Sequence, residues 1–264
     1  MRFRFVVLAL GCAACGRVSF DDVRADSVLD GTARSYPEVV LADTPYAYYR
    51  FDEAAGTVVA DSSGHGADAY LPANSGEIEY RRPGALPGDS STALRLAGEG
   101  NAGAGTEAQV WLSDLWMLWG SDFTAELFVR PLAPTPPGFA TSMLVCERYL
   151  VNGFRSGWDD ANHVQIWSHE SGGADKIQTD NASLALNRWA HVALVRRGGS
   201  IEIYLDGVLQ ANAPFGYVAP DDAPNCGIGS FAGLPQDAEF DELAIYDRAL
   251  SPARIAAHHA ASGR

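Results

Sequence analysis

Short runs in which apolar and polar residues alternate make up most of the chain. The clearest are Phe123–Arg130 and Ser200–Leu205, where every second side chain is apolar. Successive side chains of a strand point to opposite faces, so a period of two indicates a strand with one buried face. Further strand-like runs occur at 47–51, 93–96, 142–146, 163–167, 190–196 and 240–246. The pattern predicts an all-β protein.

Turn and cap signals divide these runs. Ser200–Leu205 leads into Asp206-Gly207, a strong two-residue hairpin signal, and 208–211 would be the return strand. One helix is expected near the C-terminus, because Ser251 is a good N-cap, Pro252 suits the first helical position and 253–261 is rich in Ala. Many short strands without a repeat of 20–50 residues predict a sandwich or a barrel.

The first residues resemble an export signal. A basic start at 1–4 is followed by apolar residues 5–10 and then by small residues and cysteines. This apolar stretch is too short to span a bilayer, which takes about 20 residues. A Cys after small residues resembles the bacterial lipobox, and we expect Cys15 to carry the lipid anchor. Cys12 is the alternative, although it would leave a very short apolar region; a cleaved signal with incidental cysteines is the other.

The expected organisation is therefore a signal peptide at 1–15, a flexible tether at 16–42 and one folded domain at 43–260. The tether is expected because 16–42 shows no sustained period and is rich in Asp, Ser, Arg and Gly. Gly16 stands where retained inner-membrane lipoproteins often have Asp. By this resemblance we expect the cell envelope, as an outer-membrane lipoprotein or an extracellular protein, with membrane contact only through the anchor.

The charge of the chain narrows its partners. The formal net charge is −14, and Lys and Arg form no run longer than pairs such as Arg81-Arg82. Phosphate backbones would be repelled, which argues against nucleic-acid binding. An acidic surface tolerates cations and neutral sugars.

Four motifs in a fixed order resemble the laminin-G-like, concanavalin-A-like family. They are Tyr48–Glu53 with Asp61–Gly66, Phe123–Pro131, Arg188–Ala193 with Ile203–Gly207, and Phe240–Ser251. The resemblance covers roughly residues 43–260 and implies an antiparallel jelly-roll β-sandwich with a short C-terminal helix. It also implies that the first and last strands, near 47–52 and 240–246, are paired. The fold alone does not fix function, because it hosts lectins, glucanases, adhesion modules and spacers.

A catalytic pair is not expected. Retaining glycosidases use two carboxyl groups about 5–5.5 Å apart, and related β-glucanases carry them on one strand as Glu-x-Asp-x-x-Glu. The nearest match is Glu239–Glu242, where the spacing differs and Asp241 and Glu242 should point to opposite faces. Glu126 stands alone on a central strand, and His191 is interpreted as a structural histidine. We therefore expect no catalytic residues and no enzyme activity.

A structural calcium ion and a disulfide are two further expectations. The turn Asp61–Gly66 is rich in oxygen atoms, and relatives of this fold often hold calcium between an early loop and the Asp of the closing strand. The resemblance thus implies calcium at Asp61 and Asp241; the alternative is an Asx turn without metal. Cys146 and Cys226 are the only cysteines after the leader, and export favours their pairing. Alternatively, Cys146 is a small buried apolar residue.

These features predict a non-catalytic, monomeric binding module outside the cytoplasm, most simply one that recognises carbohydrate at the cell surface. The expected site is a loop with one ring to stack on a sugar and three polar side chains: Trp158, Asp159, Asp160 and Asn162. A second aromatic cluster, Trp111, Trp116 and Trp119, is either a core-facing edge segment or a sugar-stacking platform. The alternative function is a protein–protein adhesion or spacer module that uses a flat sheet face.

Overall fold

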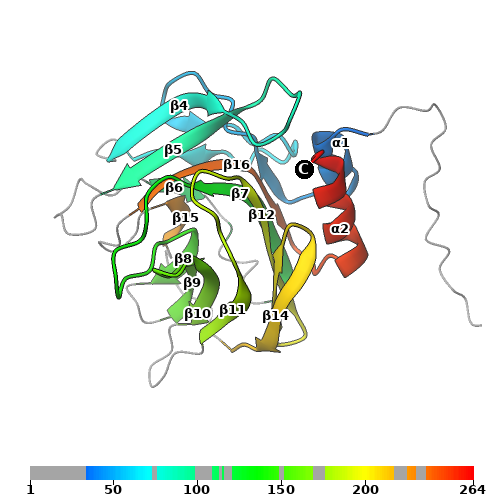
Figure 1. Ribbon diagram of the computed structural model, residues 1–264. Helices are drawn as coiled ribbons and strands as arrows, with labels where there is room; N and C mark the ends of the chain where they lie inside the picture. The colour runs from blue at the N-terminus through cyan, green and yellow to red at the C-terminus, as the bar shows by residue number, and fades with distance from the viewer. Residues whose placement is uncertain are drawn as a thin grey trace, which may run out of the picture. The chain divides into compact units, whose positions relative to one another are not determined.

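The computed structural model describes residues 34–72, 76–98, 109–112, 115, 121–148, 152–168, 176–216, 225–229 and 236–264. In these residues two antiparallel sheets form a sandwich, which confirms the predicted fold class (Figure 1). Cys12, Cys15, Trp116 and Trp119 lie outside the described residues. Among the described residues, no helix combines the length and apolar character needed to cross a membrane.

The first sheet contains both the first and the last of the described strands. In spatial order it contains β14 (Val208–Pro214), β13 (Ser200–Leu205), β12 (Ala190–Arg197), β7 (Phe123–Pro131), β16 (Gln236–Tyr246), β5 (Thr92–Gly98) and β4 (Glu77–Pro83). The first strand, β1 (Ala47–Tyr49), pairs with β16 and places Ala47 opposite Ile245. The predicted pairing of first and last strands is confirmed.

The second sheet covers the inner face of the first. Its strands, in spatial order, are β11 (Lys176–Ser183), β10 (His163–Ser168), β9 (Asn152–Trp158), β8 (Leu144–Arg148), β15 (Asn225–Gly229), β6 (Gln109–Leu112), β3 (Ala69–Tyr70) and β2 (Val58–Val59). The main core lies between the sheets, with Leu127 and Val129 from one side and Phe154 and Ile228 from the other. The β13–β14 hairpin turns at Asp206-Gly207 as predicted, and both residues have the positive φ that such turns require.

A second core lies on the outer face of the first sheet, under two helices. Helix α2 (Pro252–Ala261) confirms the predicted C-terminal helix, and the Ser251 side chain accepts the N–H of Arg254. Helix α1 (Tyr36–Ala42) lies beside it, and its Tyr36 and Val40 are buried (Figure 1). Residues 36–42 are therefore part of the folded domain, and their assignment to the tether is wrong.

The local sequence explains helix α1. Ser35 and Glu38 form a capping box, and Pro37 lies in the first turn. A helix of seven residues is not stable alone, so its packing on the sheet and on α2 maintains it. Seven residues are also too few to show a sustained period in the sequence.

A disulfide connects two neighbouring strands of the second sheet. Cys146 on β8 and Cys226 on β15 are directly opposite in the strand pairing, with their Cα atoms 4.0 Å apart, and their sulfur atoms are bonded. Both side chains are buried in the main core. The bond fixes β15 to β8 on one side, while β15 pairs with β6 on the other.

Candidate functional site

The predicted stacking ring of Trp158 is not available to a ligand. Trp158 ends strand β9 and belongs to the main core, with 1% of its surface exposed. The prediction that it lies in an exposed loop is wrong. Its Gly- and Asp-rich neighbours suggested a loop, but strand β9 runs through Gly153 and Gly157 before the turn begins.

The three predicted polar residues lie on the turn between β9 and β10, where they serve the turn itself. The Asp159 carboxylate accepts the backbone N–H groups of Ala161 and His163, and the Asp160 carboxylate accepts that of Gly138. Asn162 adopts a positive φ of 63°, which Asn tolerates better than most residues. The three residues share one turn, as predicted, but their contacts stabilise that turn and its neighbourhood, and no exposed ring lies beside them in the predicted set.

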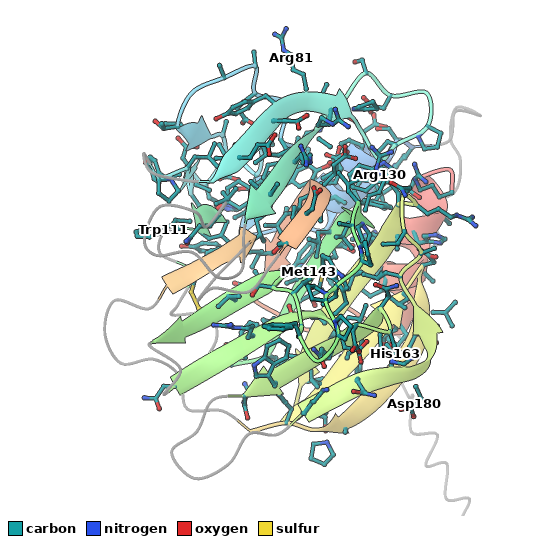
Figure 2. The ribbon with its side chains drawn as sticks, turned by 60° about the vertical axis from the view of Figure 1, so that its left-hand side comes forward. Arg81, Trp111, Arg130, Met143, His163 and Asp180 are labelled. Carbon is teal, nitrogen blue, oxygen red and sulfur yellow. A yellow bond between two sulfur atoms is a disulfide. The ribbon has the colours of Figure 1, made fainter. Side chains whose placement is uncertain are left out.

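Exposed aromatic rings lie instead on the outer face of the second sheet. Val58, Tyr70 and Trp111 lie side by side on β2, β3 and β6, because Tyr70 is paired with both of the others. Their surfaces are 44%, 47% and 47% exposed. We call these three residues the aromatic strip. Figure 2 shows Trp111 at the margin of the sandwich.

The alternation of side chains along the short strands produces the aromatic strip. The residues next to it, Val59, Ala69 and Val110, are buried in the main core, so Val58, Tyr70 and Trp111 must face outward. The indole N–H of Trp111 donates to the side-chain oxygen of Gln109, which fixes the ring. A ring that is already held in place loses little conformational freedom when a ligand stacks on it.

Of the two rings in the aromatic strip, only Trp111 had a signal in the sequence. Trp111 belongs to the cluster for which a stacking platform was one interpretation. Tyr70 gave no signal, because β2 and β3 are two residues long and show no period. The pairing of Tyr70 with Trp111 joins positions that are far apart in the chain.

The carboxylates of the closing strand differ from the sequence prediction. A bulge interrupts the pairing of β16 with β7 between Asp241 and Ala244, and Glu242 has a φ of 53°. An extra residue in one strand changes the alternation of faces. Asp241 accepts the N–H of Ala85, and Glu242 accepts the hydroxyl of Tyr48. Ala85 and Tyr48 both belong to the second core, on the outer face of the first sheet. Asp241 and Glu242 therefore face the same side, and the prediction of opposite faces is wrong.

This carboxylate pair is enclosed. Asp241 and Glu242 have no exposed surface. Burial, together with the charge of Glu242, raises the pKa of Asp241 well above its usual range. Burial raises the pKa of Glu242 to about 7, although the Tyr48 hydroxyl and Arg50 act in the opposite direction. A sugar cannot reach these groups in this structure, so they do not form a glycosidase site as folded.

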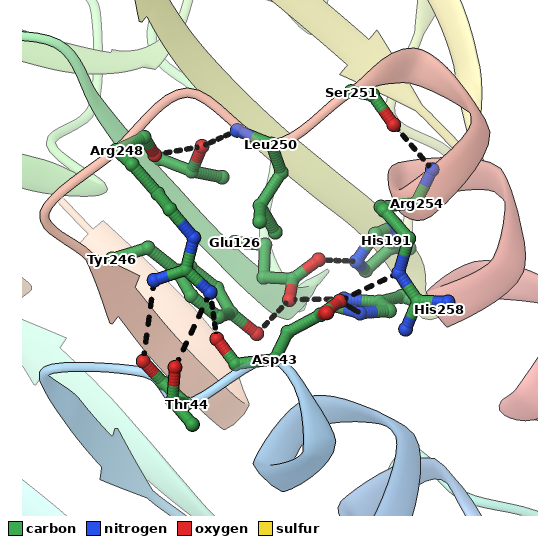
Figure 3. A network of polar contacts seen from close by, with 11 residues as sticks. Asp43, Thr44, Glu126, His191, Tyr246, Arg248, Leu250, Ser251, Arg254 and His258 are labelled. Carbon is green, nitrogen blue, oxygen red and sulfur yellow. Dashed lines mark hydrogen bonds and ion pairs between the residues drawn. The ribbon is translucent and has the colours of Figure 1, made fainter. Parts of the chain in front are cut away.

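Glu126 is the centre of a buried polar network (Figure 3). Its carboxylate accepts the Tyr246 hydroxyl at 2.8 Å and lies 2.6 Å from Nδ1 of His258 and 3.2 Å from Nε2 of His191. On the other side of the imidazole, Nε2 of His258 is 2.8 Å from the Asp43 carboxylate. These contacts confirm the structural role of His191, and the partners of Glu126 are a tyrosine and two histidines rather than a second carboxylate.

The electrostatics of this network follow from its burial. Burial opposes charge on Glu126, but the charge of His258 and the hydrogen bond with His191 outweigh it and lower the Glu126 pKa. Burial likewise opposes charge on His258, but Glu126 and Asp43 raise its pKa to about 9. Near pH 7 the network therefore holds a histidinium between two carboxylates. It joins β7 to α2 and to Asp43, directly after α1.

The contacts of Asp61 match those of an Asx turn. Its carboxylate accepts the backbone N–H groups of Tyr48, Ser63 and Ala67, and the Ser63 hydroxyl. Asp241 contacts a different segment, at Ala85. No group of three or more His, Cys, Asp or Glu residues in the described parts of the chain is placed to hold a metal ion. The donor set as folded therefore does not fit a calcium ion shared by Asp61 and Asp241.

Comparisons with solved structures agree with the fold. The chain is similar to the binding domain of Paraclostridial mosquitocidal protein 1, with 16% identity and a TM-score of 0.61. The similarity covers 83% of this chain and 52% of that one. It is also similar to the binding domain of botulinum neurotoxin DC in complex with SialylT, with 12% identity and a TM-score of 0.62. This similarity covers 84% of this chain and 52% of that one. Trypanosoma rangeli sialidase in complex with sialic acid gives 16% and a TM-score of 0.56, with 81% and 32% covered.

These similarities concern the fold and only part of each of the other proteins. The chain spans about half of each toxin binding domain and about a third of the sialidase, and identities this low show the fold alone. No curated protein matches the sequence. A family model matches residues 104–256, which is more than half of the chain. The chain belongs to the concanavalin A-like lectin/glucanases superfamily, under its laminin-G model.

Proposed function

We propose that this domain is a non-catalytic carbohydrate-binding module and that the aromatic strip is its binding site. The observation that carries the proposal is the pair of adjacent exposed rings, Tyr70 and Trp111, on the outer face of the second sheet. Aromatic faces pack well on the apolar faces of sugar rings. Neighbouring apolar side chains that are exposed on a soluble protein often mark a surface where a partner binds. The position of these two rings on a regular sheet therefore favours a recognition role.

The comparisons support a binding role for this fold. Two of the similar structures are binding domains, and one of them is in complex with SialylT. The family description names both lectins and glucanases, so absence of catalysis is part of the proposal. It is motivated by the enclosure of Asp241 and Glu242 and of Glu126, the carboxylates nearest to a glucanase pattern.

Substitution of the strip tests the function. We expect wild-type protein to bind a subset of an array of immobilised glycans. Trp111→Ala and Tyr70→Ala should each weaken that binding roughly tenfold or more, which corresponds to about 1.4 kcal/mol of binding free energy. Phe139→Ala is the matched control, because Phe139 is 51% exposed but lies outside the strip. Asp160→Ala tests the turn predicted from the sequence and should leave binding unchanged. Circular dichroism should show all four variants folded.

Two outcomes would contradict this proposal. Loss of glycan binding in Asp160→Ala with no loss in Trp111→Ala would return the site to the β9–β10 turn. No glycan bound by the wild type, together with loss of cell adhesion in Trp111→Ala, would favour the alternative of a protein–protein adhesion module. The strip lies on a sheet face, which such a module would also use.

Calcium remains a proposal of the family resemblance. Calcium needs several oxygen atoms at once, so binding would require Asp61 to exchange its present donors for the ion. The proposal requires that added calcium raise the melting temperature and that a chelator lower it. An unchanged melting temperature, with identical glycan binding in both conditions, would leave the Asx turn as the full account of Asp61.

Export and lipid anchoring also remain proposals, based on the first 15 residues. In a bacterial host we expect the wild-type chain to fractionate with membranes and Cys15→Ser to be released from them. Cys12→Ser is the matched control and should remain with membranes. Retention of Cys15→Ser together with release of Cys12→Ser would move the anchor to Cys12, and retention of both variants would contradict lipidation at either cysteine.

A further inference from the structure

The segments of sequence that carry the aromatic strip contain no basic residue. Strands β2 and β3 lie within residues 51–80, β6 within 96–129, and the adjoining β15 within 198–247. None of these three stretches contains a Lys or an Arg. They do contain acidic residues, among them Glu53, Asp61 and Asp68 near β2 and β3.

The nearest cations on the same face of the second sheet are distant or buried. A single row of paired residues crosses the sheet: Val58, Tyr70, Trp111, Gly227, Val145, Arg155, Trp167 and Lys176. Arg155 lies three strands from Trp111, which is about 14 Å at the usual strand spacing. It is 3% exposed. Lys176 is exposed, but it lies five strands from Trp111, far beyond the Debye length of about 8 Å at physiological salt.

We infer that the aromatic strip selects neutral glycans and discriminates against sialylated or sulfated ones. The inference rests on the function proposed above and specifies its ligand class. An anionic sugar would approach a chain of net charge −14, and the segments that carry the strip provide no Arg or Lys to pair with its carboxylate or sulfate. A neutral pyranose meets no such penalty, since stacking on Tyr70 and Trp111 requires only an apolar face. A neutral ligand would differ from the molecules bound in two of the similar structures, which are complexes with sialic acid and with SialylT.

The inference makes binding by the strip insensitive to salt. Stacking removes apolar surface from water and involves no ion pair, so raising the ionic strength should change the affinity less than twofold. An anionic sugar bound through an ion pair would show the opposite, because salt weakens the attraction between opposite charges. The repulsion of a single sialic acid should weaken binding about threefold or more at low salt, and this difference should shrink as salt is added.

The test is an array in which each neutral core glycan is printed with and without a terminal sialic acid, probed with the full chain at low and high salt. We expect the neutral member of each bound pair to give the stronger signal. Val58→Arg supplies the missing cation at the end of the strip, where Val58 is 44% exposed. It should raise binding of the sialylated member relative to the neutral one by about threefold, and its matched control Val58→Gln should not.

Each result decides between the inference and the proposed function. Equal or stronger binding of sialylated glycans, or loss of binding at high salt, would overturn the neutral-ligand inference while leaving carbohydrate binding intact. Binding of neither member by wild type and by Val58→Arg would overturn both. Preference for neutral glycans that Trp111→Ala does not weaken would place the selective site elsewhere and overturn the inference for the strip.

Discussion

The substitution Glu126→Gln is expected to lower the free energy of unfolding by about 3–5 kcal/mol, because it removes one member of a buried ionic network. Glu126 is fully buried and its oxygens interact with Tyr246, His191 and His258. The amide keeps the size of the side chain but carries no charge, so His258 loses its closest counter-charge. One amide oxygen also cannot serve all three partners. Urea unfolding of wild type and variant measures the difference.

The Glu126→Gln substitution should also change the pH dependence of the free energy of unfolding. The pKa of His258 is about 9 in the folded protein against 6.5 for a free histidine, so its contribution is fully present below pH 6.5 and is lost as the pH rises through 9. The lowered pKa of Glu126 acts in the opposite range: its contribution is present above pH 4.5 and is lost as the pH falls further. Glu242, with its pKa raised to about 7, also loses its contribution as the pH rises from 4.5 to 7.

Comparing wild type with Glu126→Gln above pH 7 isolates the histidine, because Asp241, whose pKa is raised well above its usual range, contributes to the slope of both proteins. Wild-type stability should fall between pH 7 and pH 9, and this slope should be smaller in Glu126→Gln, because removing the carboxylate brings the His258 pKa down. Glu77→Gln is the matched control, since Glu77 is exposed and its ion pair with Arg95 should contribute less than about 1 kcal/mol. A Glu126→Gln protein as stable as wild type, with an unchanged slope, would show that the network is not ionised as described.

The sequence predicted the architecture because many independent runs agreed on it. The alternating runs at Phe123–Arg130 and Ser200–Leu205 became β7 and β13, and the Asp206-Gly207 signal became the expected hairpin. These features depend on neighbours in the chain. Helix α1 was missed because its stability comes from contacts of Tyr36 and Val40 with residues distant in sequence.

The errors at the candidate sites have the same origin. The bulge at Glu242 reverses the facing of one carboxylate, and no residue near it announces an inserted position. The sequence indicates a loop at Trp158 because glycines interrupt the strand pattern around it, although the strand continues. Tyr70 joins Trp111 only through the pairing of β3 with β6. A period read along the chain cannot show which strands become neighbours, and that information decides where exposed rings meet.

Removing the disulfide is expected to cost about 4–5 kcal/mol in the chain-entropy model, because Cys146 and Cys226 are separated by 80 residues. The bond restricts the unfolded chain over this long loop, and in the folded protein it joins β15 to β8 within the main core. Urea unfolding of a chain with Cys12→Ser and Cys15→Ser, with and without reductant, measures the effect of the bond alone.

The double variant Cys146→Ala/Cys226→Ala provides the control for this measurement. It should be less stable than the oxidised protein and should not respond to reductant, whereas the protein with both cysteines should lose stability when it is reduced. Thiol titration of the unfolded, unreduced protein should find neither Cys146 nor Cys226 free. Free thiols at both positions, or equal stability with and without reductant, would show that the two sulfur atoms are not bonded in solution. In that case β15, which presents Gly227 beside Trp111, would be held to the second sheet by its backbone pairing and core packing alone.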